Sequence, residues 1–338
     1  MFNQNITMAS SESTSSVDEA ITAKMAALGI YGQTPQPEET PEFLSKSHAA
    51  LLTELDKLPS EKKAGWTKAV EKCPNLVGED HRLMFLRCEV FNEELAALRI
   101  CKYWNRRIEL FGENRAYKPI HLGGDGALSS NSDSTSSEHD DTTKKQNDED
   151  EAMVKYTMKG IKLGFFRPTL THDTGGRAIV FVDPSRLAGY NKNSVDERMG
   201  VARALWYIMH NAIEGNDVVQ KLGMVAIAHP QHAKISVVDR KLMKLNIESI
   251  SGCIPIRIGG FHIVQPPWFF TKIVFPFMKV IMPDRMRKRV RVYSGGEAKI
   301  LKELKEVGLG REVLPSEIGG DVILDIESWI LEMTSRGL

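Results

Sequence analysis

The sequence lacks the signs of several common protein classes. It has four cysteines that form neither a Cys-x-x-Cys pair nor a disulfide pattern, so we expect reduced, buried thiols at Cys73, Cys88, Cys101 and Cys253. The first basic residue is Lys24 and no apolar core precedes it, which argues against a secretory signal and a mitochondrial presequence. We therefore expect a cytoplasmic protein.

Catalytic motifs are missing as well. The chain has no Gly-x-Ser-x-Gly, no Walker A lysine pattern and no Gly-x-Gly-x-x-Gly. Gly295 and Gly296 lie between an expected strand and an expected helix, where phosphate can bind, but the missing motifs favour a tight turn there. His229 and His232 have no third ligand at a telling distance, which favours surface histidines over a metal site. We expect no catalytic residue, no metal and no cofactor other than a bound ligand.

The formal net charge is zero, and this balance conceals an uneven distribution. Residues 1–45 contain one basic and six acidic residues, and residues 123–151 contain two and nine, so these segments together carry minus twelve. The remaining chain carries plus twelve. Net charge therefore identifies no partner by itself, because a basic body is joined to acidic segments.

Composition and periodicity divide the chain into five parts. Residues 1–42 are rich in Ser, Thr, Pro and acidic groups, and 123–151 lack large apolar groups, so we expect a disordered tail and a disordered acidic insertion. Residues 43–122 form an N-terminal helical part, in which the pattern is helical from Phe43 to Phe111. Residues 152–325 alternate apolar strands with helices, which predicts a mainly parallel sheet covered by helices, and 326–338 form a C-terminal helix. The predicted fold class is α/β with an N-terminal helical bundle.

An apolar stretch occupies residues 268–282, where only three side chains are polar. Apolar groups lie on nearly every side of a helix there, as in helices that are buried or that meet lipid. The stretch is shorter than the about twenty apolar residues that a bilayer-spanning helix needs, and two lysines and Pro276 interrupt it. We expect an interfacial or lid helix, and burial in an ordinary core is the alternative.

A cluster of cations follows this stretch: Arg285, Arg287, Lys288, Arg289 and Arg291. Alone, the cluster resembles a nuclear-localisation or nucleic-acid patch, and a solvated basic face is a second interpretation. Its position beside an apolar helix favours an anionic membrane surface over a nucleic acid.

Four stretches together resemble the CRAL-TRIO lipid-transfer family over residues 80–322. They are "FLRCEVFNEELAALRICKYWNRR", "DTGGRAIVFVD", "IPIRIGGFHIVQPPWFFTKIVFPFMKVIMPDRMRKRVRVYSG" and "LPSEIGGD". The resemblance implies a helical bundle followed by an α/β domain, whose sheet forms the floor of a pocket for one hydrophobic molecule and whose residues 266–283 form a lid.

The resemblance also implies site residues by position. The pocket residues are Leu205, Met209, Ile250, Ile254, Phe261, Trp268 and Phe270. The lid residues are Phe269, Ile273, Phe277 and Ile281. The phosphoinositide or membrane contacts are Arg257, Arg285, Arg287 and Arg289.

Two positions depart from the family pattern. Ile256 stands where phosphatidylinositol exchangers carry a glutamate, and Glu89 stands where relatives have a second arginine after the "FLR" motif. The first departure argues against phosphatidylinositol exchange, and the second weakens the expected phosphoinositide site.

The function that these patterns predict is a soluble carrier, not an enzyme. It binds one small hydrophobic lipid and transfers it at anionic membranes, including phosphoinositide-containing ones, and is peripheral at membranes. The acidic insertion could compete with the membrane for the cations. The alternatives are a phospholipid exchanger or sensor that presents lipid to modifying enzymes and, from another class, a nucleotide-dependent enzyme.

Overall fold

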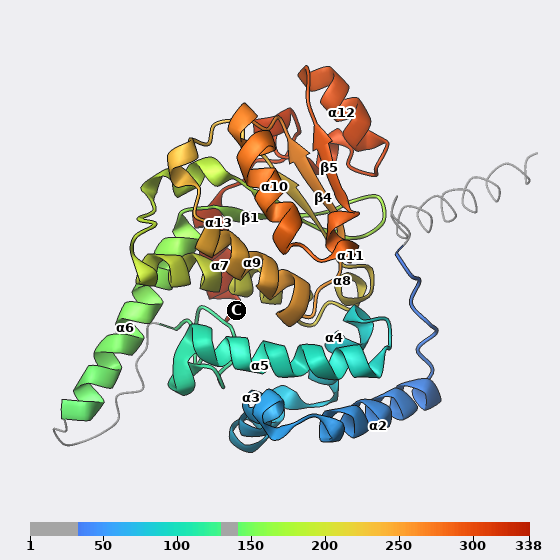
Figure 1. The fold of residues 1–338 in the computed structure, drawn as a ribbon, viewed down its shortest axis with the longest axis vertical. Helices are drawn as coiled ribbons and strands as arrows, with labels where there is room; N and C mark the ends of the chain where they lie inside the picture. The colour runs from blue at the N-terminus through green and yellow to red at the C-terminus, as the bar shows by residue number, and fades with distance from the viewer. Residues whose placement is uncertain (1–32, 130–140) are drawn as a thin grey trace, which may run out of the picture.

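Helices form the N-terminal part of the protein, as the periodicity of residues 43–111 predicts. The computed structural model describes residues 33–129 and 141–338. The helical part contains α2 (Pro41–Lys57), α3 (Ser60–Lys72), η1 (Pro74–Val77), α4 (Glu79–Cys88) and α5 (Glu93–Arg115). In Figure 1 these elements lie together at the bottom of the molecule, below the α/β part.

Local signals account for the ends of these helices. Thr40 caps α2, where its hydroxyl oxygen accepts a hydrogen bond from the Phe43 amide at 3.2 Å, so α2 begins two residues before the expected start. Residues 33–40 form extended chain rather than part of a disordered tail, and residues 1–32 lie outside the described chain. The amphipathic face of α5 is buried as expected, with Trp104 at its centre.

The acidic insertion is partly helical, which differs from the predicted disorder through residue 151. Helix α6 runs from Asp141 to Lys162, while residues 130–140 lie outside the described chain. Its C-terminal half packs tightly on α7 (Val195–Ile213), and the two helices approach closely at Gly160 and Gly200. A Cβ on Gly160 would lie only 2.6 Å from the Gly200 carbonyl carbon, so a larger residue does not fit there. Docking of this half stabilises the polar turns before it, which composition alone does not reveal.

The α/β part contains a five-stranded sheet in the order β1-β2-β3-β4-β5. Strand β1 is antiparallel to β2, and the other neighbouring pairs are parallel. The strands are β1 (Phe166–His172), β2 (Ala178–Val182), β3 (Met224–Ala228), β4 (Ile258–Val264) and β5 (Val290–Tyr293). The predicted fold class is confirmed.

The remaining helices cover the sheet and connect its strands. The α-helices after α7 are α8 (Asp217–Leu222), α9 (Arg240–Glu248), α10 (Phe275–Ile281), α11 (Asp284–Arg287), α12 (Glu297–Lys305) and α13 (Ile326–Ser335). Short 3-10 turns are η2 (Pro184–Gly189), η3 (Ile235–Val237), η6 (Arg311–Val313) and η7 (Ser316–Ile318), and π turns are η4 (Ser249–Cys253) and η5 (Phe270–Val274).

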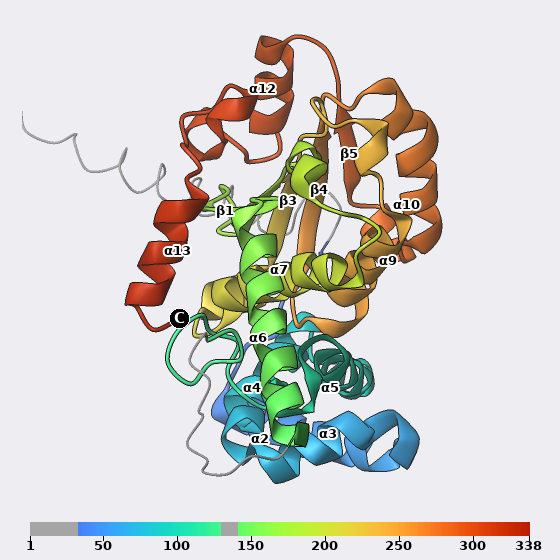
Figure 2. The same ribbon diagram turned by 90° about the vertical axis from the view of Figure 1, so that its left-hand side faces the viewer.

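Alternation of side chains along the strands gives the sheet two apolar faces. Val180 and Val182 belong to a large core shared with α7, α9 and α10, whereas Ile179 and Phe181 belong to a second core with α12. Figure 2 shows the sheet between α12 on one side and α9 and α10 on the other. The sheet is therefore the middle layer, and the larger core lies on the α10 side.

Two expectations about covalent and membrane structure can be compared with the structure. All four cysteines are free and buried, which confirms the predicted thiols. In the part of the chain that the structure describes, no helix has the length and apolar character to cross a membrane.

Candidate functional site

An apolar cavity of about 140 Å³ lies between the sheet and the segment that contains η5 and α10. Its floor includes Ala226 and Ala228 of β3, and Leu242 and Ile247 of α9 form a side wall. Alanines on the strand leave room that larger residues would fill. The site is therefore lined by apolar surface with little that could perform chemistry.

Residues 268–282, the stretch expected to form a lid and called the lid below, have an inner and an outer face. Phe269, Phe270, Val274 and Met278 line the cavity and are buried. The outer face carries three exposed apolar side chains: Trp268 (71% exposed), Ile273 (36%) and Val280 (82%). One face of the lid is therefore buried against the cavity, and the other face is exposed.

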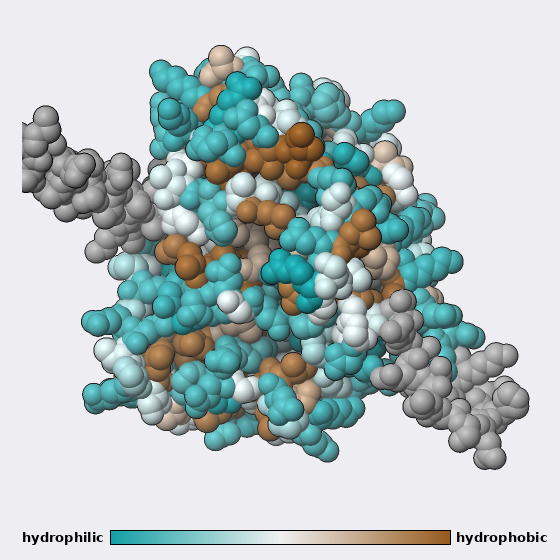
Figure 3. All heavy atoms as spheres, turned by 180° about the vertical axis from the view of Figure 1, so that it is seen from behind, coloured by the Kyte–Doolittle hydropathy of each residue, from teal (hydrophilic) through white to brown (hydrophobic). Residues whose placement is uncertain are grey.

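The backbone of the lid is irregular at its centre. Residues 270–274 form a π turn that ends two positions before Pro276, which has no amide hydrogen to donate to the preceding turn. On the opposite face of the protein, shown in Figure 3, hydrophobic residues form separate patches among hydrophilic ones.

The predicted pocket residues divide into three groups. Met209, Ile250, Phe261 and Phe270 line the cavity together. Leu205 and Ile254 are completely buried but do not line it, because they pack within the surrounding core. Trp268 points outward, since the inward positions of this turn are taken by Phe269 and Phe270, and we correct its place from the pocket to the outer face of the lid.

The predicted lid residues also occupy different positions. Phe269 contributes to the cavity wall and Ile273 to the outer face. The Arg240 guanidinium lies over the Phe277 ring, with its Cζ atom 5.5 Å from the ring centroid. This contact links the lid to α9. Ile281 is partly buried against the main core.

The sequence did not identify the contribution of α9 and the segment before it. Val237, Val238, Leu242, Met243 and Ile247 line the cavity. The spacing of Leu242, Met243 and Ile247 by one, four and five positions along a helix was an available signal, because it places apolar side chains on one face.

A second, larger hollow of about 650 Å³ lies between the helical part and the start of β4. We call it the cationic cleft. Its wall contains two acidic side chains, Glu89 and Asp284, and five basic ones, a formal excess of three positive charges. The basic residues are Arg99, Lys102, Arg257, Arg285 and Arg289.

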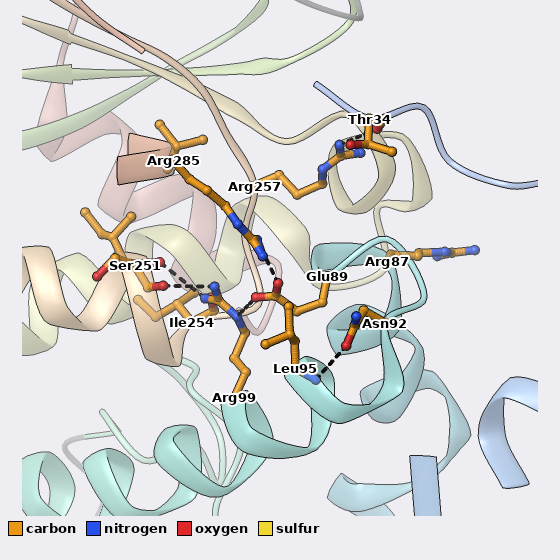
Figure 4. Close-up of polar contacts among 12 residues, drawn as sticks. Thr34, Arg87, Glu89, Asn92, Leu95, Arg99, Ser251, Ile254, Arg257 and Arg285 are labelled. Atoms are coloured by element: carbon orange, nitrogen blue, oxygen red, sulfur yellow. Dashed lines mark hydrogen bonds and ion pairs between the residues drawn. The ribbon is translucent and has the colours of Figure 1, made fainter. Parts of the chain in front are cut away.

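Glu89, the departure noted in the sequence, lies at the centre of this cleft. Its carboxylate accepts hydrogen bonds from Arg99 Nε at 2.6 Å and from Arg285 Nη1 at 2.9 Å. Figure 4 shows the three side chains converging from α5, from the end of α4 and from α11. Arg99 also donates hydrogen bonds to the carbonyl oxygens of Ile254 and Ser251, and these contacts hold its side chain in place beside Glu89.

Arg257 and Arg289 have a different kind of partner. Arg257 donates to the carbonyl oxygens of Thr34 (2.7 Å) and Lys221 (2.6 Å), and Arg289 donates to that of Ile258 (2.8 Å). Burial lowers the pKa of both guanidinium groups, and neighbouring arginines lower it further. Within the described chain neither forms an ion pair with a carboxylate, so this part of the cleft is suited to an anion.

Arg287 does not join the other three predicted cations. Its side chain pairs with Asp284 and donates to the Lys279 carbonyl oxygen at 3.3 Å, on the exposed surface beside the lid. The reason is the helical turn of α11, which directs Arg285 toward the cleft and Arg287 away from it.

The cavity and the cleft share part of their walls. Ile250, Ile258 and Met286 line both. Arg285 and Met286 are consecutive residues of α11, and the first reaches the cleft while the second fills the edge of the cavity. A displacement of α11 would therefore change both spaces at once.

The remaining candidate motifs have structural roles. His229 is buried, which corrects the expected surface position, whereas His232 is exposed as expected. His229 Nε2 lies 2.9 Å from Gln231 Oε1 and 3.2 Å from Gln265 Oε1, and the described residues contain no cluster of three metal-ligating side chains. Gly295 has a φ of 121° in the turn before α12, a conformation that favours glycine and agrees with the expected tight turn.

The CRAL/TRIO domain model matches residues 166–320, a range that contains the sheet, the lid and most of the cavity wall. This chain carries a CRAL/TRIO domain. The resemblance to the CRAL-TRIO family that the sequence suggested is confirmed over this range.

Known proteins similar to this chain match it over short stretches. Clavesin-1 of Rattus norvegicus is 33% identical over 89 residues, which are 26% of this chain and 23% of clavesin-1. Tyrosine-protein phosphatase non-receptor type 9 of Homo sapiens is 25% identical over 129 residues, which are 38% of this chain and 20% of the phosphatase. The chain thus spans about a quarter or less of the length of these curated relatives. The word phosphatase describes the relative and is not applied to this chain.

One solved structure is similar over most of the chain. The crystal structure of Sfh5 has a TM-score of 0.43 and 12% sequence identity, and the likeness covers 88% of this chain and 98% of that chain.

Proposed function

We propose that this CRAL/TRIO protein carries one hydrophobic lipid beneath the lid and exchanges it at anionic membranes. The single observation that supports this most is the shared wall of Ile250, Ile258 and Met286, because it joins an apolar cavity to a cationic cleft. An apolar tail and an anionic membrane surface are thus received side by side. A phosphoinositide headgroup, with several phosphate oxygens, is the anion that the cleft arginines fit best.

The physical reason for such a carrier is the cost of exposing a lipid tail to water. A tail of about twenty carbons costs on the order of 16 kcal/mol at roughly 0.8 kcal/mol per methylene, so unaided transfer is slow. A closed apolar cavity avoids that exposure during transit. The lining of phenylalanine, isoleucine, leucine and methionine side chains suits a chain or ring without polar groups.

The lid must move for a lipid to enter. The cavity of about 140 Å³ is smaller than the roughly 300–1,000 Å³ of typical ligand pockets. Outward movement of residues 268–282 enlarges it, and the π turn before Pro276 gives the lid an interrupted hydrogen-bond ladder at which to bend.

A membrane interface is the place where this movement costs least. Trp268 and Val280 already project from the outer face, and Lys272 and Lys279 are exposed beside them. Apolar side chains flanked by lysines are typical of segments that lie in the interfacial region of a bilayer. The open lid would bury its inner phenylalanines in lipid rather than expose them to water.

The Glu89–Arg285 ion pair provides a latch between the cleft and the lid. It ties the end of α4 to α11, which directly follows the lid. A lipid phosphate that competes with Glu89 for Arg285 releases α11, and Met286 then leaves the cavity edge with it. Opening is thereby coupled to contact with an anionic surface.

Identification of the co-purified ligand tests the proposal. Purified full-length protein should contain one lipid per chain, detected by liquid chromatography and mass spectrometry of an organic extract. An isoprenoid or similar apolar lipid supports the carrier, and a phosphoglyceride supports the alternative exchanger or sensor. Tight binding of a nucleotide by protein that holds no lipid would overturn the proposal in favour of an enzyme.

A cavity-filling variant is the matched control for that extract. Ala226→Leu adds three carbons to a residue whose side chain faces the cavity, so the fold should remain and the lipid should be lost. Equal lipid content in Ala226→Leu and the wild type would show that the extracted lipid was bound elsewhere.

A further inference from the structure

We propose that Thr34 is a phosphorylation site, and that the phosphate group placed there occupies the cationic cleft and excludes a membrane headgroup. Thr34 lines the cleft and is exposed. Its carbonyl oxygen accepts a hydrogen bond from Arg257 Nη2 at 2.7 Å, so the residue lies directly beside one of the cleft arginines (Figure 4). The exclusion of a membrane headgroup rests on the proposed function, whereas the binding of the phosphate group in the cleft does not.

The segment that holds Thr34 is a strap of extended chain, residues 33–40, laid across α4 and α8. Gln36 Nε2 donates to the carbonyl oxygens of Arg87 (2.7 Å) and Lys221 (3.2 Å). The Glu39 carboxylate forms ion pairs with Arg87 at 2.7 Å and with Lys221 at 3.1 Å. These contacts fix the strap at the edge of the cleft and keep Thr34 within reach of its cations.

The sequence of the strap suits a proline-directed Ser/Thr kinase. Such kinases modify a hydroxyl residue that directly precedes proline in an extended, accessible chain. Thr34 and Pro35 are both exposed, and proline restricts the preceding residue to extended conformations. In the reaction the Thr34 hydroxyl oxygen bonds to the γ-phosphorus of ATP, the bond to the β-phosphate oxygen breaks to release ADP, and the hydroxyl proton passes to the kinase base.

The same strap contains a second Thr-Pro pair that serves as a control. Thr40 precedes Pro41, is exposed, and caps α2 by accepting a hydrogen bond from the Phe43 amide. It does not line the cleft. A phosphate on Thr40 therefore adds the same charge to the same segment without reaching Arg257.

The cleft recognises a phosphate on Thr34 by charge and geometry. The group carries about −1.5 to −2 charges and three strong acceptor oxygens. Arg257 can exchange the Thr34 carbonyl oxygen for a phosphate oxygen, and Arg289 and Arg285 line the same cleft. Because the phosphate is attached to the protein, its effective concentration is in the millimolar range or above, so a headgroup competes at a disadvantage.

The first test asks whether the residue is modified. Full-length protein is incubated with a proline-directed kinase and ATP, and tryptic peptides are mapped by mass spectrometry. We expect phosphate on Thr34 that is absent from the Thr34→Ala protein. Phosphate on Thr40 alone, or on neither residue, would overturn the proposal.

The second test locates the phosphate without any lipid. Phosphoserine is incorporated genetically at position 34 or at position 40, and its second pKa is measured by phosphorus NMR. At position 34 it should fall from about 6 to about 5 or below, and Arg257→Gln or Arg285→Gln should reverse the fall. Equal values at positions 34 and 40 would contradict occupation of the cleft.

The third test measures the consequence. Phosphatidylcholine vesicles that contain a phosphatidylinositol bisphosphate should bind the protein with phosphoserine at position 34 at least tenfold more weakly than the protein with phosphoserine at position 40. Equal binding would overturn the competition. If the unmodified chain bound no such vesicles, the proposed headgroup site would fail, while the NMR measurement would still decide where the phosphate lies.

Discussion

The carboxylate of Glu89 and the guanidinium of Arg285 lie 2.9 Å apart although 196 residues separate them in the chain. The Glu89 side chain is 6% exposed and the Arg285 side chain is 64% exposed, so the pair has one buried member and one member that a membrane can reach. This asymmetry suits exchange of partners: Glu89 stays fixed by Arg99 while Arg285 is free to turn toward a phosphate.

Removal of the Glu89 charge should strengthen binding to anionic membranes. Glu89→Gln removes the competitor for Arg285 and Arg99, so we expect several-fold tighter binding to phosphoinositide vesicles and unchanged binding to neutral ones. Stability should fall by on the order of 1–3 kcal/mol, because a buried charge-assisted hydrogen bond weakens. Sedimentation with vesicles and urea unfolding measure the two effects.

The control for this variant is Glu113→Gln, which removes a carboxylate paired with Lys68 and Lys72 on the exposed surface of the helical part. It should change neither vesicle binding nor, by more than about 0.5 kcal/mol, stability. If both variants changed vesicle binding equally, the latch would be excluded and a general effect of net charge would remain.

Loss of cleft cations should weaken membrane binding. Arg285→Gln with Arg289→Gln removes two charges worth about 1 kcal/mol each near an anionic surface, so affinity should fall on the order of tenfold or more. The effect should shrink at high salt. Arg311→Gln, at an exposed arginine paired with Asp321, is the control and should bind like the wild type. Equal affinity of the double variant and the control would contradict the role of the cleft.

The outer face of the lid should contribute through apolar contact. Trp268→Ala together with Val280→Ala should weaken binding to anionic vesicles several-fold, because less apolar surface enters the interface. Thermal stability should change little, since both side chains are exposed. Leu331→Ala on α13 has the same kind of side chain at 72% exposure and should have no effect on vesicle binding. A similar loss for Leu331→Ala would mean that the lid is not the membrane-facing surface.

Acid should destabilise the protein before most of its carboxylates titrate. Burial, together with nearby arginines, lowers the pKa of His81 to about 3 and the pKa values of His210 and His262 to about 4. The unfolded chain binds these protons near pH 6.5 and the folded chain does not, so stability is complete above that pH and is lost as pH falls toward 4.

The free energy of unfolding should fall with pH at a slope that the number of buried histidines sets. Each buried histidine contributes up to about 1.4 kcal/mol per pH unit within the window. His262→Gln should remove about one third of the slope while the protein stays folded at pH 7. Urea unfolding at a series of pH values measures it, and a free energy of unfolding that stayed constant between pH 7 and pH 4.5 would contradict the account.

The sequence predicted the architecture because it depends on local patterns. Alternation of apolar residues identified the strands, and the apolar stretch beside a basic cluster identified the segment that covers the cavity, whose role as a lid stays a prediction. Orientation around one turn was harder to predict: Trp268 faces outward because Phe269 and Phe270 take the inward positions.

Contacts between residues far apart in the chain account for the other features that the sequence did not predict. The helix from Asp141 gains stability from the close approach of Gly160 to Gly200, forty positions apart, which composition does not reveal. The described part of this acidic helix lies on the side of the molecule away from α11 in Figure 1, and its Asp150 pairs with Arg115 rather than with the cleft. Glu89 was noticed as a departure from a pattern, and only the structure places it against Arg285.

The central claim is that the lid swings outward at an anionic bilayer, and a distance measurement tests it most directly. Spin labels replace Val280 on the lid and Leu331 on α13, both exposed, and the distribution of distances between them is recorded by pulsed electron resonance. We predict a single distribution in buffer and with neutral vesicles, and an additional distribution at longer distance with vesicles that contain a phosphatidylinositol bisphosphate. An identical distribution in all three conditions would contradict the account.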